Sequence, residues 1–101
     1  MSYQIIWQPN SEASYFEEID FIFRKWNHVE VQKFQDLVFE ILSRLAENPL
    51  IGKYDELSKV YTIVISKQTT LYYSFNHKEK NIDLHVFCNN LKNPTELTKL
   101  L

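Results

Sequence analysis

The chain has 101 residues, of which 45% are apolar and 15% aromatic, and its formal net charge is −2. This length suits one domain over residues 1–101. The aromatic content is enough to form a core without disulfides, metals or cofactors. A chain with such a core is not disordered. The single cysteine, Cys88, cannot form an internal disulfide, and the absence of a secretion leader and of a run of roughly 20 apolar residues predicts a cytoplasmic, non-membrane protein.

The N-terminal quarter predicts a strand followed by a helix. Tyr3–Trp7 is a short β-rich run that Pro9 ends. Asn10 or Ser11 can cap the helix that follows, because both side chains accept hydrogen bonds from free backbone N–H groups. Apolar residues then recur at helical spacing and predict the buried stripe: Ala13, Phe16, Ile19, Phe23 and Trp26.

A second helix is predicted from about Val29 to Ala46, where Asn48-Pro49 ends it. The short link between the helices favours an antiparallel hairpin. The apolar stripe of this helix is Phe34, Leu37, Val38, Ile41, Leu42 and Leu45.

Residues 50–57 are predicted to form a loop, and three strands follow it. These are Lys59–Ile65, Thr70–Asn76 and Ile82–Cys88, each with alternating apolar residues. In the last strand, alternation predicts that Ile82, Leu84, Val86 and Cys88 face the helices, while Asp83, His85 and Phe87 face away. The predicted fold is α+β, of order β-α-α-β-β-β, with a helical hairpin packed on one face of a small antiparallel sheet.

This order, together with several local features, resembles the RelE/ParE superfamily of toxins from type II toxin–antitoxin systems. The matching pieces are Ile5-Ile6-Trp7 before a helix with Ala13, Leu45-Ala46-Glu47-Asn48-Pro49 with Gly52 beyond it, Leu71-Tyr72-Tyr73-Ser74-Phe75, and Asn89-Asn90-Leu91-Lys92-Asn93-Pro94. The resemblance covers nearly the whole chain, and its strength lies in the ordered combination.

The resemblance implies a plasmid-stabilisation type of toxin that a cognate antitoxin protein holds inactive, and it allows a homodimer. RelE-like members are ribosome-dependent endoribonucleases that cut messenger RNA. ParE-like members share the fold and poison DNA gyrase instead. Fold alone does not separate these activities.

Cleavage of RNA by its own 2′-hydroxyl needs a base, a cation beside the phosphate and an acid. The candidates for these roles are His85, Lys59 and Lys92, and the candidates for contact with RNA or a protein partner are Lys53, Tyr54, Tyr61, Tyr72, Asp83 and Phe87. Each has an ordinary alternative: solvated lysines, a half-exposed strand histidine, and aromatic residues that pack against a partner protein.

The distribution of charge weakens the nuclease interpretation. Leu91 stands where the family often has arginine, and lysine at position 92 lacks the bidentate geometry of a guanidinium. Residues 1–50 carry four basic against eight acidic side chains, and residues 51–101 carry seven against five, so neither half is strongly basic.

Three functional readings therefore stay open. The first is a toxin, either ParE-like or with a weakened or lost RelE-like nuclease. The second is a non-catalytic protein-interaction module that uses the sheet face away from the helices. The third is an unrelated small enzyme, which the sequence disfavours because no nucleophile–base pair or metal set is visible.

Overall fold

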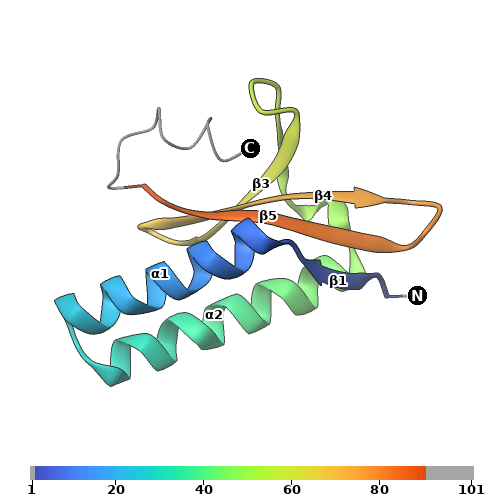
Figure 1. Ribbon diagram of the computed structural model, residues 1–101. Helices are drawn as coiled ribbons and strands as arrows, with labels where there is room; N and C mark the ends of the chain where they lie inside the picture. The colour runs from blue at the N-terminus through green and yellow to red at the C-terminus, as the bar shows by residue number, and fades with distance from the viewer. Residues whose placement is uncertain (1, 91–101) are drawn as a thin grey trace.

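The computed structural model describes residues 2–90, which form a hairpin of two helices packed on one face of a five-stranded sheet (Figure 1). The strands lie in the order β1-β5-β4-β3-β2. The elements are β1 (Gln4–Trp7), α1 (Pro9–Lys25), α2 (His28–Glu47), a 3-10 turn (Pro49–Ile51), β2 (Lys53–Asp55), β3 (Val60–Ser66), β4 (Thr69–Asn76) and β5 (Asn81–Asn89). The predicted α+β layer pair is confirmed.

The sheet differs from the prediction in two respects. It is mixed, because β1 runs parallel to β5 while the other neighbouring strands are antiparallel. It also has an additional strand, β2, within the segment predicted to be a loop. A strand of three residues is too short to show alternation, so only its pairing with β3 defines it.

Helix α2 follows the sequence closely. Its N-cap is Asn27, whose side chain accepts a hydrogen bond from the backbone N–H of Glu30. Phe34, Val38 and Leu45 are buried against the sheet as predicted. Leu37 departs from the predicted stripe, because its side chain is 39% exposed.

Helix α1 begins earlier than predicted, and the expected caps are wrong. Its N-cap position is Gln8, which makes no side-chain capping bond, and Pro9 occupies the first turn. Proline is favoured there because the N–H it lacks would have no partner within the helix. Asn10 and Ser11 therefore lie inside the helix, where the Ser11 hydroxyl donates to the Gln8 carbonyl oxygen at 2.7 Å.

The predicted apolar stripe of α1 is also wrong. The buried side of the helix carries Ser11, Ser14, Glu18 and Ile22, whereas Phe16 is 65% exposed. The stripe also fails at Ala13, Phe23 and Trp26, which are exposed, and Ile19 is half-buried. The face of α1 that meets the sheet is thus mostly small and polar.

Those polar residues cover the edge of β5 that β1 leaves free. Pairing with β1 stops at Leu84, and α1 lies alongside the rest of β5 (Figure 1). The Phe87 N–H donates to the Ser14 hydroxyl at 2.8 Å, and the Gln8 N–H donates to the Leu84 carbonyl at 3.2 Å. Small side chains let the helix approach closely, and polar ones satisfy a strand edge that lacks a neighbour. We call β5 from Leu84 to Asn89, with α1 against it, the closed edge.

A buried tyrosine fixes the other side of the sheet. The Tyr73 hydroxyl donates to the Pro49 carbonyl oxygen at 2.6 Å and accepts from the Gly52 N–H at 3.1 Å. A Cβ at position 52 would lie 2.3 Å from that hydroxyl, so only glycine fits this approach. Burial raises the pKa of Tyr73 to about 12, and the bond from Gly52 acts in the opposite direction. This contact ties the 3-10 turn and the residue before β2 to the Tyr73 side chain of β4.

Candidate functional site

A β-bulge in β5 organises the face of the sheet that points away from the helices, which we call the open face. Tyr72 pairs with Val86 and Tyr73 with Leu84, so His85 is the extra residue between them. A bulge re-aims the side chains that follow it. His85 and Val86 consequently lie on the same face of the sheet.

The bulge reverses the predicted orientation of the end of β5. Phe87 pairs with the core residue Leu71 and packs in the helix-side core, with ring centroids 5.5 Å from Trp7 and 5.4 Å from Tyr15. Val86 and Cys88 pair with Tyr72 and Thr70 and lie on the open face, although both side chains are buried there. The predictions that Phe87 faces away from the helices and that Val86 and Cys88 face them are wrong. Because residues 86, 87 and 88 are all apolar, alternation cannot reveal the shift.

Four side chains form a polar cluster on the open face: His85, Ser74, Asp83 and Tyr72. The His85 Nε2 atom lies 2.8 Å from the Ser74 hydroxyl oxygen of β4. Asp83 is the register partner of Ser74, and its Oδ1 accepts a hydrogen bond from the Gln8 side-chain amide at 3.0 Å. Tyr72 lies on the same face, two residues before Ser74. His85, Asp83 and Tyr72 therefore share the face on which the sequence placed them.

Burial controls the protonation of this cluster. Burial lowers the pKa of His85, and the nearby Asp83 carboxylate only partly opposes it, so the imidazole is neutral at pH 7. In the tautomer that leaves Nε2 without a proton, Ser74 donates to it. The pKa of Tyr72 is raised by burial, so its phenol stays protonated. The cluster thus offers a neutral base, a hydroxyl and a phenol.

Ser74 is the participant that sequence reasoning missed. The Ser74–His85 contact brings a hydroxyl and a base within hydrogen-bond distance, which is the geometry of a nucleophile–base pair. The two residues are eleven positions apart on neighbouring strands. The alternation of β4 places Ser74 away from the core, but only the register with β5 brings it to His85.

The other predicted site residues do not join this cluster. Lys53 of β2 pairs with Thr62 of β3, and β2 lies three strand positions away from β5 in the sheet. Lys59 has a left-handed backbone (φ 62°) in the turn between β2 and β3. Tyr54 and Tyr61 lie in register with the buried Tyr73 on the helix side of the sheet. The remaining candidate, Lys92, lies outside the described residues.

The open face carries little positive charge. Among the strand residues that the structure places on it, Lys53 is the cation, and Asp55 and Asp83 are the carboxylates. Hydrogen bonds from the side chain and backbone of Ser58 lower the pKa of Asp55, which keeps this carboxylate charged. Both arginines of the chain lie on helices and form ion pairs, Arg24 with Asp20 and Arg44 with Glu40.

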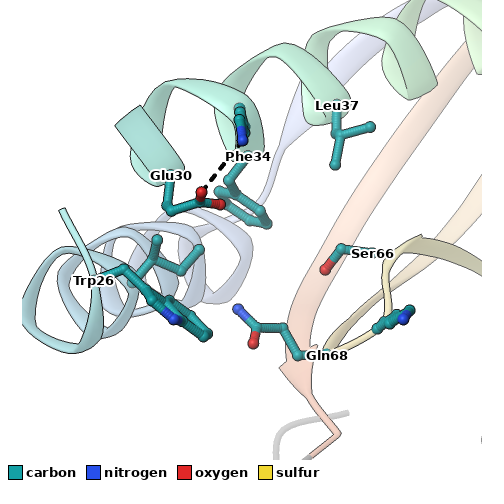
Figure 2. Close-up of a pocket in the computed structure, with 9 residues that line it drawn as sticks. Trp26, Glu30, Phe34, Leu37, Ser66 and Gln68 are labelled. Carbon is teal, nitrogen blue, oxygen red and sulfur yellow. Dashed lines mark hydrogen bonds and ion pairs between the residues drawn. The ribbon is translucent and has the colours of Figure 1, made fainter. Parts of the chain in front are cut away.

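A pocket of about 280 Å³ lies where the end of α1 and the start of α2 meet the β3–β4 turn. Figure 2 shows Trp26, Glu30 and Phe34 around it and the Gln68 amide directed into it. Lys33, which also lines the pocket, forms an ion pair with Glu30. None of the predicted site residues lines this pocket. It therefore adds nothing to the cluster around His85.

Two further properties concern the described part of the chain. Between residues 2 and 90, no three His, Cys, Asp or Glu side chains converge as metal ligands would. Within the same range, neither helix has the length and apolar character that a membrane span requires.

Comparison with known proteins identifies the fold. No family model matches the sequence, and no curated protein matches it. In structure, the chain is similar to a chain of the toxin–antitoxin complex RelBE2 from Mycobacterium tuberculosis, with a TM-score of 0.59 and 13% sequence identity. The match covers 88% of this chain and 99% of that one. The fold implied by the resemblance to the RelE/ParE superfamily is therefore confirmed.

Proposed function

We propose that this protein is the toxin of a toxin–antitoxin module and that a cognate antitoxin protein neutralises it. The observation that carries the proposal is the shared fold with a chain of a toxin–antitoxin complex, over 88% of this chain. The ordered sequence features that resemble RelE/ParE toxins also support the proposal, because they extend along the chain from Ile5 to Pro94.

We propose further that the toxin acts by binding a protein target, as ParE-like toxins bind DNA gyrase. RNA binding depends on Lys and Arg that neutralise phosphates. Among the strand residues of the open face, Lys53 carries the positive charge and Asp55 and Asp83 carry the negative charges. Both arginines form ion pairs on the helices. This balance favours a protein surface over a phosphate backbone.

Ribosome-dependent RNA cleavage is the second candidate, and His85 is the reason to keep it. A neutral imidazole with a lowered pKa can take the proton of a 2′-hydroxyl near pH 7. In this case Ser74 positions the ring, and Tyr72 is available as a stacking or donating group. The catalytic roles of Lys59 and Lys92 remain predictions.

Induced expression in bacteria tests the proposal directly. We expect growth arrest by the chain alone and recovery when the protein encoded by an adjacent gene is produced with it. No arrest would rule out an active toxin and favour the non-catalytic interaction module. If arrest occurs, inhibited supercoiling by purified gyrase supports the protein-target mechanism, whereas new messenger RNA ends in translating cells support cleavage.

A pair of variants tests whether the cluster on the open face takes part. His85→Gln removes the base. The matched control is His77→Gln in the turn between β4 and β5, an exposed histidine whose Nδ1 lies 2.7 Å from the Tyr3 hydroxyl and outside the cluster. If RNA is cut, we expect His85→Gln to abolish the cuts and His77→Gln to retain them. Equal cutting by both variants would exclude His85 as the base.

A further inference from the structure

The edge of the sheet at β3 is open, in contrast to the closed edge at β5. Strand β2 pairs with Val60, Tyr61 and Thr62 and reaches no further along β3. Within the described residues, no strand pairs with the outer side of Ile63–Ser66. We call this segment the open edge. Its Val64 side chain is 63% exposed.

A groove of about 770 Å³ runs between the open edge and α2. Its apolar lining comes from Ile63 and Val64 of β3, Ile41 of α2 and Ile51 of the 3-10 turn. The side chain of Ile51 is 41% exposed, so the apolar surface continues from the edge into the turn. An unpaired strand edge and an apolar groove thus lie side by side.

Such an edge is unusual in a protein that stays soluble by itself. Natural sheets protect exposed edges with charged residues, proline or a covering element, because a free apolar edge pairs with other chains. Strand β3 contains neither a charged residue nor a proline from Val60 to Ser66, and its one irregularity is a bulge at Ile65, where the register with β4 shifts. The closed edge of the same sheet is protected by α1 through the Ser14–Phe87 hydrogen bond. Ahead of the bulge, Ile63 and Val64 have no charge, no proline and no paired strand on their outer side within the described residues, which is the property of an edge that pairs with a partner protein.

The charges around the groove indicate what kind of segment fits. Its rim carries Glu40, Arg44 and Glu47. The guanidinium of Arg44 lies 2.8 Å from the Glu40 carboxylate, so these two charges largely cancel. Glu47 leaves the rim with one net negative charge, which favours a lysine or arginine on the incoming chain.

We propose that the open edge binds an extended segment of a partner protein, which adds to the sheet as a strand beside β3. Backbone hydrogen bonds to Ile63–Ser66 hold the segment, alternate apolar side chains enter the groove, and a basic side chain lies near Glu47. The binding mode does not depend on the proposed function. Only the identification of the partner as the antitoxin rests on it.

Amide hydrogen exchange tests the edge without an antitoxin. The probe is a synthetic hexapeptide of alternating lysine and valine, blocked at both ends, and its control carries glutamate in place of lysine. We expect the lysine peptide to slow exchange within Ile63–Ser66 by at least about tenfold and the glutamate peptide to have less effect. Protection elsewhere on the protein, or none, would overturn the proposal.

Two variants separate the edge from its surroundings. Val64→Lys places a charge on the open edge, and Leu57→Lys adds the same charge at a side chain that is 84% exposed in the turn between β2 and β3. We expect only Val64→Lys to abolish protection by the peptide. If the free protein forms a dimer that Val64→Lys dissociates, a second copy occupies the edge and the proposal is wrong.

Co-expression links the edge to the antitoxin. We expect Val64→Lys to retain growth arrest but to escape rescue by the adjacent gene product, whereas Leu57→Lys is rescued normally. Rescue of both variants would show that the antitoxin does not use this edge. Absence of arrest in the unmodified protein would contradict the proposed function, and the peptide experiment would still decide whether the edge accepts a strand.

Discussion

The part of β5 that extends beyond β1 and the part of β3 that extends beyond β2 differ in how the sequence treats an unpaired strand. At the closed edge, α1 gives its buried side to Ser11, Ser14 and Glu18, and the Ser14 hydroxyl accepts the Phe87 N–H. At the open edge, Ile65 is buried in the core, whereas Val64 keeps an apolar side chain that is 63% exposed. One edge is satisfied within the chain, and the other is suited to a second chain. Polar residues buried in a helix can therefore protect a strand, and apolar residues exposed on a strand can mark a contact.

The largest effect is expected where β2 is fixed beside the open edge. In Gly52→Ala, the new Cβ would lie 2.3 Å from the Tyr73 hydroxyl and 2.7 Å from the Thr62 carbonyl oxygen. Because both atoms are held in place, we expect a loss of about 3 kcal/mol in the free energy of unfolding, measured with urea. Tyr73→Phe removes the nearer atom, so the double variant should lose less than the sum. Full additivity would contradict this account.

Breaking the closed edge should cost somewhat less. Ser14→Ala leaves the buried Phe87 N–H without its acceptor, and we expect a loss of about 2 kcal/mol in unfolding free energy. Ser43→Ala is the matched control, since Ser43 is an exposed helix serine that bonds only to its own helix, at Phe39. Similar stability changes in the two variants would mean that Ser14 does not protect the edge.

A pH dependence of stability should come from His85, at the bulge of the closed edge. The pKa of His85 is lowered in the folded protein from an ordinary value of 6.5, so the unfolded chain binds the proton more readily. Stability should therefore fall as the pH drops below 6.5 toward the lowered value. Urea unfolding at about pH 7.5 and about pH 5.5 should show a larger loss for the unmodified protein than for His85→Gln. An equal loss in both would contradict a lowered pKa.

The smallest effect on stability is expected at the open edge itself. Val64→Lys changes an exposed side chain, so its unfolding free energy should stay within about 0.5 kcal/mol of the unmodified protein. Such a small change, compared with the loss of about 2 kcal/mol expected for Ser14→Ala, would show that the open edge contributes to binding rather than to folding. A loss above about 1 kcal/mol would place Val64 in the core instead.

The predictions from sequence were correct for elements that bury one side, because their apolar residues recur at a regular helical or strand spacing. Helix α2 shows its stripe at Phe34, Val38 and Leu45, and β4 alternates through Leu71 and Tyr73. In these elements the hydrophobic pattern and the packing agree, and Leu37 of α2 is the departure from the predicted stripe.

The predictions from sequence were wrong where one specific contact, rather than the spacing of apolar residues, decides which side chains are buried. In α1 the requirement is to satisfy the edge of β5, which selects Ser14 over a large apolar residue, so the exposed Phe16 was wrongly placed in the core. In β5 the bulge at His85 reverses the face of Phe87. Ser74 escaped detection as the partner of His85 because register between strands is a tertiary property.

The parallel pairing of β1 with β5 also bears on how the protein is made. Gln4 pairs with Asn81 and Trp7 with Leu84, so the first strand has no partner until nearly eighty later residues have been synthesised. The helical hairpin needs only local contacts and can form early, whereas joining β1 to β5 closes a long loop and should be slow. On a translating ribosome, the pairing of β1 with β5 and the cluster around His85 are therefore assembled last.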